Sequence, residues 1–323
     1  MQPLNIGELW MWVAFIVFVV AMLALDLFVF GGRKAHRVSV REASCWVIAW
    51  CALTLTFAGL LWWYLHGEFG PEIARRKTLE FFTGYLIEQS LSIDNMFVFV
   101  MIFSYFAVPA ELQRRVLLYG VLGAIVMRGM MILAGVWLVS QFAWLLYAFG
   151  VFLIITGIKM LAFAHQRPDL DKNPLLRWMH GRLRVTDEFH GDHFFVLKEG
   201  RHWATPMFLV LVLIEASDLM FAVDSIPAIF AITTDPFIVF TSNIFAIMGL
   251  RALYFLLADM ADRFHLLKYG LAIVLVFIGA KMTLIPWLHM PIEWSLAVVG
   301  GIILTSVLLS LILTRKEDQI RSL

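Results

Sequence analysis

Two apolar stretches of this 323-residue sequence carry acids at matching spacing. Glu88 and Asp94 stand six residues apart in IEQSLSIDN, and Asp218 and Asp224 stand six apart in SDLMFAVDSIP. Glu215 adds a fifth acid just before the second pair. Carboxylates with neutral oxygens beside them are the ligands that hard divalent cations prefer. The two stretches therefore predict an oxygen site for a cation.

The residues around these acids indicate that the surrounding solvent is a lipid bilayer. Hydrophobic residues make up 61% of the chain, charged residues only 15%, and the mean hydropathy is +0.84. Apolar runs of about 20 residues recur along the whole chain, as in helical membrane proteins. We predict an all-α polytopic membrane protein with about nine transmembrane helices, near 10–30, 44–65, 79–106, 116–139, 143–163, 206–232, 237–258, 267–288 and 294–313.

Lysine and arginine fall mainly on one side of these predicted spans. That side holds 18 of the 25 basic residues, in loops 31–43, 107–115, 164–205 and 259–268 and in the C-terminus. The opposite side holds only Arg75, Arg76 and Lys77. The positive-inside rule therefore predicts an N-terminus outside and a C-terminus in the cytoplasm.

The acidic stretches open two halves of similar pattern within a single transmembrane domain, 1–323. Each half has two acids, an arginine and a lysine in the same order: Glu88, Asp94, Arg128 and Lys159, then Asp218, Asp224, Arg251 and Lys281. The halves, 79–163 and 206–288, contain three predicted spans each, an odd number, so they cross the membrane in opposite directions. An inverted repeat of this kind is typical of secondary transporters.

The segment between the halves, 164–205, is predicted to be a solvated cytoplasmic connector. A metal-sensing patch is the alternative that its acids and histidines leave open: Asp187, Glu188, His190, Asp192 and His193.

Charged residues inside the predicted spans do not balance. Six acids face four bases, Asp26 being the sixth acid and the bases being Arg128, Lys159, Arg251 and Lys281. A lone charge at mid-membrane costs about 2.5–3.5 kcal/mol, so internal ion pairs are expected. If each base pairs with one acid, two carboxylates have no basic partner. Their two negative charges match the charge of one divalent cation. No histidine lies deep in a span, and only two cysteines exist, so the donor set favours Mn²⁺, Mg²⁺ or Ca²⁺.

Six residues turn a helix by about 600°, so the two acids of each pair face about 120° apart on a straight helix. Both acids can meet one ion only if the helix unwinds near them. Pro227, and the polar side chains of SLSIDN and VDS, favour such an interruption. We therefore expect helices broken at mid-membrane.

The motifs IEQSLSIDN and IEASDLMFAVDSIP resemble the paired signatures of the TerC family of integral membrane proteins. The whole chain resembles the Alx-type branch of that family, which implies a multi-pass protein of the bacterial inner membrane that exports Mn²⁺. The family's acidic motif positions, taken as metal ligands, fall here on Glu88, Asp94, Asn95, Glu215, Asp218, Asp224 and Ser225.

The other intramembrane charges are expected to support this site. Asp26 is either an acid behind the ligands or a charge at a span end. Arg128 and Arg251 are predicted counter-ions that could occupy the carboxylates when no cation is bound. Lys159 and Lys281 are counter-ions or extend toward an interface.

We therefore expect a secondary transporter that exports a divalent cation, Mn²⁺ first, with Ca²⁺ or Mg²⁺ as alternatives. No permanently bound cofactor, enzyme activity or nucleic-acid partner is expected; the partners are the cation and the bilayer, and the oligomeric state is open. The alternatives are a membrane-bound redox modulator, a tellurium-resistance-type stress protein and an intramembrane aspartate enzyme. Cys45 and Cys51, about 9–10 Å apart on one helix, are beyond disulfide reach.

Overall fold

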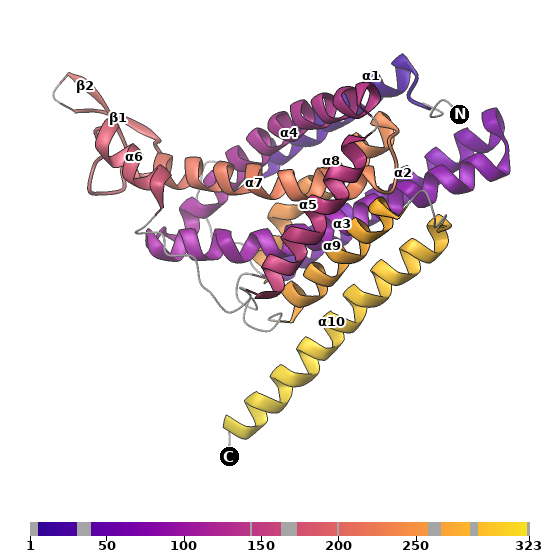
Figure 1. The fold of residues 1–323 in the computed structure, drawn as a ribbon. Coiled ribbons are helices and arrows are strands. Elements are labelled where there is room, and N and C mark those ends of the chain that lie inside the picture. The colour runs from indigo at the N-terminus through magenta and orange to yellow at the C-terminus, as the bar shows by residue number, and fades with distance from the viewer. Residues whose placement is uncertain are drawn as a thin grey trace.

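The computed structural model describes residues 6–30, 40–142, 144–162, 173–198, 200–257, 266–284 and 290–321, with side chains except at 26–30, 40, 94, 180, 257, 311 and 314–321. The elements, in chain order, are α1 (Leu9–Phe30), α2 (Val40–Phe69), α3 (Pro71–Tyr105), α4 (Ala110–Gln141), α5 (Leu145–Ala162), α6 (Pro174–Arg182), β1 (Phe195–Lys198), β2 (Arg201–Ala204), α7 (Pro206–Phe230), α8 (Pro236–Leu257), α9 (Leu267–Thr283) and α10 (Ile292–Arg321). Figure 1 shows the long helices stacked into one bundle, with α10 at its edge.

The predicted fold class is confirmed. Within the residues that the structure describes, seven helices are long and apolar enough to cross a membrane, and they lie in α2, α3, α4, α5, α7, α8 and α10. A shorter apolar stretch of α1, Leu9–Leu25, and the 17-residue α9 are compatible with about nine spans. The orientation across the membrane and the inverted repeat stay predictions.

Helices α3 and α7 run without interruption over 35 and 25 residues, so the expected mid-membrane breaks are wrong. Pro227 lies in the last turns of α7, which ends at Phe230, so little helix remains beyond it to disturb. Ser90 and Ser217 donate to the carbonyls of Leu86 (2.6 Å) and Leu213 (2.8 Å). These hydroxyls are satisfied within the helix and leave its backbone ladder intact.

Helix α8 is the centre of the bundle. Every residue from 241 to 250 is buried, and α8 packs on α2, α3 and α4. Helix α7 packs on α3 and α4, and α5 lies along α9. An aromatic cluster that includes Phe15, Phe57, Phe81 and Phe245 joins α1 and α2 to this centre.

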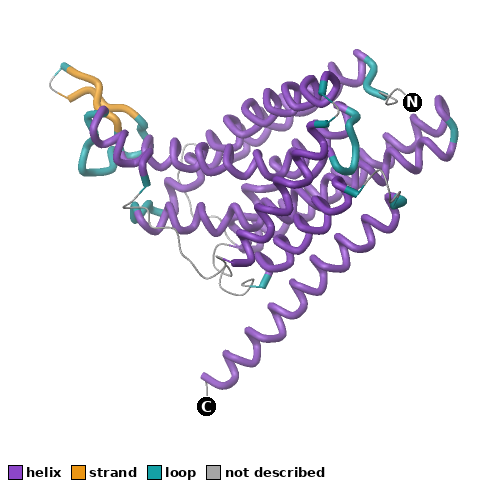
Figure 2. Tube along the Cα trace, in the orientation of Figure 1, coloured by secondary structure: helices purple, strands orange, loops and turns teal. Residues whose placement is uncertain are grey.

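The described part of the segment between α5 and α7, from residue 173 on, forms a short helix and a two-stranded hairpin. The side chain of Asn173 caps α6 by accepting from the amides of Leu175 (2.9 Å) and Leu176 (3.3 Å). Strands β1 and β2 pair antiparallel, with Phe195 opposite Ala204. Figure 2 shows this hairpin projecting from one end of the helical bundle.

Candidate cation site

Arg128 of α4 joins two carboxylates that come from the two halves of the chain. Its Nε and Nη2 donate to Asp218 Oδ2 (3.0 Å) and Oδ1 (2.8 Å), and its Nη1 forms an ion pair with Glu88 Oε1. Arg128 and Glu88 are 0% exposed and Asp218 is 3% exposed. A bidentate guanidinium–carboxylate contact is among the stronger polar interactions in proteins. One positive charge therefore serves two buried negative charges.

Glu88 lies on the interior face of α3. Gly84, Glu88, Ser92 and Asn95 fall within an arc of about 80° on that helix. A Cβ atom on Gly84 would lie 2.8 Å from Ser242 Oγ, so this face packs against α8. Glu88, Ser92 and Asn95 are at most 1% exposed. The α3 residues of the predicted site thus point together into the bundle.

Three predicted ligands share one face of α7. Glu215, Asp218 and Ser225 fall within an arc of about 80°, together with Ile229. A Cβ atom on Gly84 would lie 3.6 Å from Ile229 Cγ2, so this face packs against α3. Ser225 is buried, and Glu215 is half-buried and interacts with the charge of Asp218. The packing of α3 on α7 brings together the faces that carry Glu88, Asn95, Asp218 and Ser225.

Asp224 does not lie with this group. It points about 120° away from Asp218 because α7 is unbroken between them. It is half-buried and interacts with Thr156 and Lys159 of α5. The side chains of Asp94 and Asp26, the other predicted acids, lie outside the described residues.

Several oxygens of the group are buried and have no hydrogen-bond partner among the residues that the structure describes. These atoms are Ser92 Oγ, Asn95 Oδ1, Glu215 Oε2 and Ser225 Oγ. Leaving a buried polar group unsatisfied costs about 1–3 kcal/mol. No set of three or more His, Cys, Asp or Glu within the described ranges is arranged to hold a metal ion. The oxygens needed by a cation are present, but Arg128 occupies the carboxylates.

Ser92 and Asn243 were not predicted. Asn243 of α8 is 0% exposed, and both of its amide atoms lack a partner within the described part of the chain. The sequence carried a weak signal, since Thr241, Ser242 and Asn243 form a polar triplet in an apolar span. Ser92 stands among other serines of α3, and its spacing alone did not separate it from them.

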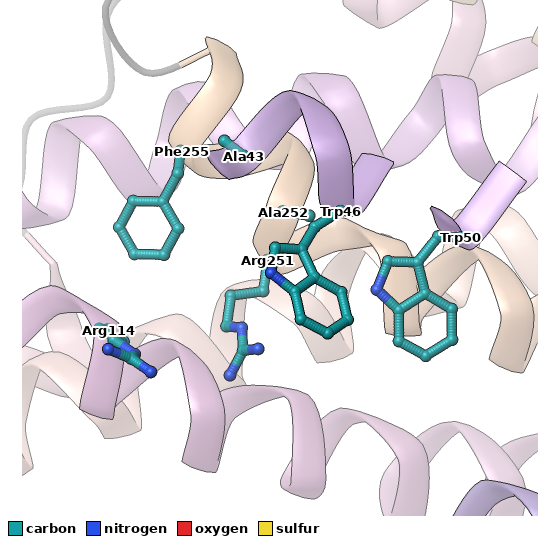
Figure 3. Close-up of a pocket in the computed structure, with 7 residues that line it drawn as sticks. All are labelled: Ala43, Trp46, Trp50, Arg114, Arg251, Ala252 and Phe255. Atoms are coloured by element: carbon teal, nitrogen blue, oxygen red, sulfur yellow. The ribbon is translucent and has the colours of Figure 1, made fainter. Parts of the chain in front are cut away.

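Arg251, the counterpart of Arg128 in the predicted repeat, lies in different surroundings. It lines a cavity of about 10 Å³ together with Arg114, Trp46, Trp50 and Phe255 (Figure 3). That volume accommodates about one water molecule.

A second group of buried charges lies at the end of the bundle predicted to be outside. Lys77 Nζ contacts Glu80 Oε2 (3.0 Å) and Asp235 Oδ2 (3.1 Å), and all three residues are buried. Thr233 Oγ1 donates to Glu80 Oε2 (2.7 Å), which ties α3 to the connection between α7 and α8. Glu80 and Asp235 were not predicted as buried charges, because they lie at a span end and in a short loop.

Lys281 lies beside this outer group. It is half-buried, interacts with the charge of Glu80, and lines a cavity of about 430 Å³. Charged residues of α3 and α10 complete the lining, among them Glu72, Arg75, Arg76 and Glu293. Lys281 is therefore a counter-ion of the outer group and does not lie at mid-membrane.

Comparison with known proteins points to one family. The model described as "Integral membrane protein TerC family" matches residues 73–318. A protein of Escherichia coli (strain K12) named "Putative membrane-bound redox modulator Alx" is 54% identical over 318 residues, covering 98% of this chain and 99% of its own. The Salmonella typhi protein of the same name is 53% identical over 315 residues, 98% of each chain.

A Myxococcus xanthus relative named "Uncharacterized membrane protein STKORF319" is 50% identical over 311 residues, covering 96% of this chain and 95% of its own. No solved structure matches this chain. The similarity therefore rests on sequence and extends over almost the full length of these relatives.

Proposed function

Because this chain belongs to the TerC family of integral membrane proteins, we propose that it is a secondary transporter that exports a divalent cation. Mn²⁺ is the proposed substrate, and the proposed location is the inner membrane of a bacterium. The observation that carries the proposal is the buried pair of carboxylates on Arg128, Glu88 and Asp218, with the half-buried Glu215 beside Asp218. We propose no catalysed reaction.

The formal charges of this group favour a divalent substrate. Glu88, Glu215 and Asp218 carry three negative charges when ionised, and Arg128 carries one positive charge. The remaining two negative charges balance one divalent cation. A cation in a low-dielectric interior needs such compensation, since an unpaired buried charge is costly.

The donor set favours Mn²⁺ and its hard neighbours. Carboxylate, hydroxyl and amide oxygens surround the group, from Glu88, Asn95, Asp218 and Ser225. Oxygen ligands of this kind suit Mn²⁺, Mg²⁺ and Ca²⁺, whereas Zn²⁺ and Cu⁺ favour nitrogen or sulfur ligands. Asn95 Oδ1 and Ser225 Oγ have no partner in the described part of the chain, so a cation can recruit them without breaking a bond.

Arg128 acts in this mechanism as an internal substitute for the substrate. With no cation bound, its guanidinium satisfies Glu88 and Asp218. An arriving cation takes over both carboxylates and displaces the guanidinium. On release the guanidinium returns, so the two acids are never left buried and unpaired.

Contacts between α5 and α9 support the inverted repeat that this mechanism uses. The alignment that pairs Lys159 with Lys281 also pairs Gly157 with Gly279, and Gly150 with Ala272. A Cβ atom on Gly157 would meet the carbonyl of Ala272, and one on Gly279 would meet the carbonyl of Gly150. Exchanging the two halves converts one contact into the other, as a pseudo-twofold axis between α5 and α9 requires.

The names of two relatives mention redox activity. In this chain the thiols that could take part in it are those of two cysteines. Cys45 and Cys51 are both free and exposed on α2. Six residues of an α-helix rise by about 9 Å, so the Cα atoms of these two cysteines are too far apart to form a disulfide. We therefore propose transport in preference to thiol chemistry.

The direct test is metal flux through purified protein in liposomes that enclose a metal-sensitive dye. We expect Mn²⁺ to enter faster than in protein-free liposomes, and Glu88→Gln or Asp218→Asn to raise the KM for Mn²⁺ at least about tenfold. Glu72→Gln, in the outer cavity, is the control and is expected to transport normally. Mg²⁺, Ca²⁺ and Zn²⁺ are compared in the same assay. Flux no faster than in empty liposomes contradicts the proposal.

A further inference from the structure

We propose that Asn243 of α8 is a ligand of the transported cation, which it contacts through its amide oxygen. This inference rests on the transport function proposed above. Asn243 stands outside the two acidic motifs, so the family resemblance assigns it no role.

Asn243 differs from its two polar neighbours in how its side chain is satisfied. Thr241, Ser242 and Asn243 are all 0% exposed. Thr241 Oγ1 donates to the carbonyl of Phe237 (2.8 Å), and Ser242 Oγ donates to that of Val239 (3.2 Å). Neither amide atom of Asn243 has a partner among the described residues. A fully buried amide has two donors and an acceptor to satisfy, so this position points to a missing ligand.

The packing of α8 on α3 places Asn243 near Glu88. Ser242, the preceding residue, lies against Gly84 of α3. Glu88 is one helical turn beyond Gly84 on the same face, and helical side chains lean toward the N-terminus of their helix. The carboxylate of Glu88 is thereby directed back toward the level of Gly84 and therefore toward this part of α8.

The packing of α8 on α4 places Asn243 near Arg128 as well. Phe240, one turn before Asn243, lies against Gly129 of α4, where a Cβ atom would come within 3.3 Å of the ring. Arg128 is the residue next to Gly129. Asn243 therefore lies on the part of α8 that is held between the helices carrying Glu88 and Arg128.

A neutral ligand is suited to this position. The carboxylates around Arg128 already supply the two excess negative charges that a divalent cation needs. A further carboxylate would leave the loaded site negative, whereas an amide oxygen adds a hard donor without adding charge. An amide also replaces part of the hydration shell that the cation loses on entering the bundle.

The test compares Asn243→Leu with two control variants from the same buried triplet, Thr241→Val and Ser242→Ala. We expect Asn243→Leu to raise the KM for Mn²⁺ in liposomes, and the Kd of Mn²⁺ for the detergent-solubilised protein, at least about tenfold. The controls are expected to stay within about twofold of the wild type, because their hydroxyls bond only to their own helix. The metal-free thermal midpoint of Asn243→Leu should equal or exceed that of the wild type, since leucine removes an unsatisfied amide.

Two results overturn the assignment. If Asn243→Leu binds and transports Mn²⁺ like the wild type, the amide is no ligand. If the metal-free variant unfolds at a clearly lower temperature or fails to fold, the amide is structural. Failure of the transport proposal is recognised separately, because the wild type then moves no Mn²⁺ while the binding measurement still tests Asn243.

Discussion

Asp218 and Asp224 lie six residues apart on one unbroken helix and contact different neighbours. Asp218 receives two hydrogen bonds from Arg128 of α4, whereas Asp224 interacts with Thr156 and Lys159 of α5. The two acids of the second motif therefore have different environments, although their types and spacing match those of the first motif. Their substitutions should have different effects.

We expect Asp218→Asn to raise the KM for Mn²⁺ at least about tenfold, because it removes a carboxylate from the group around Arg128. Asp224→Asn should change KM less and should lower stability only slightly, because its partner Lys159 is exposed and can extend toward an interface. Flux assays and thermal unfolding separate the two effects. A KM increase for Asp224→Asn as large as that for Asp218→Asn contradicts this assignment.

Arg128→Leu tests the role of the guanidinium as a substitute cation. It leaves Glu88 and Asp218 buried without a counter-charge, which typically costs about 3–5 kcal/mol. We expect Mn²⁺ to restore more stability to Arg128→Leu than to the wild type, since the ion replaces the missing charge. Thermal unfolding with and without Mn²⁺ measures this difference. Arg75→Met, at an exposed ion pair with Glu293, is the control and should cost at most about 1 kcal/mol.

Gly157→Ala and Gly279→Ala test the close contact of α5 with α9. Their Cβ atoms would lie 2.7 Å and 2.6 Å from backbone oxygens of the opposite helix. Overpacking against a backbone that cannot yield costs about 1–3 kcal/mol. Gly301→Ala in α10, where no atom lies within 4 Å of the new Cβ, should cause no loss of stability. Thermal unfolding in detergent distinguishes them, and equal midpoints for all three variants contradict the contact.

Single cysteines test the predicted orientation. In a Cys45→Ser, Cys51→Ser background, Glu293→Cys should react with a membrane-impermeant maleimide in intact spheroplasts, because it lies at the predicted outer end. Lys198→Cys, in the exposed hairpin, should react only after the membrane is permeabilised. The reverse pattern of labelling would show that the positive-inside assignment has the wrong sign.

Much of the candidate site was predictable from residue types alone. The predicted ligands include Glu88, Asn95, Asp218 and Ser225, and the structure brings together the helix faces that carry them. The reason is that a charged or amide group in an apolar span is costly unless it meets a partner. The broken helices were predicted wrongly because Pro227 and the serines were taken as interruptions, whereas α7 stays helical through Pro227 to Phe230 and Ser90 and Ser217 bond within their own helices. Without the break, Asp224 points to α5.

The choice of partners was not predictable. Arg128 and Arg251 are equivalent in the repeat, and both are basic residues in apolar spans. Only the packing of α4 on α7 brings Arg128 to Asp218, whereas Arg251 of α8 lines a cavity that Arg114 also lines. Asn243 escaped prediction for the same reason, because an unsatisfied amide is recognised only when its neighbours are known.

The sequence by itself determined that this protein resides in a membrane as a bundle of helices, and that acids and bases lie together within its apolar spans. Those properties follow from composition and from the cost of charge in hydrocarbon, which are local to each span. Only the tertiary structure decided which acids share Arg128, which one lies near Lys159, and which buried polar atoms find no partner within the described part of the chain. Each of those outcomes depends on the rotation of one helix against another, which contacts between distant residues set.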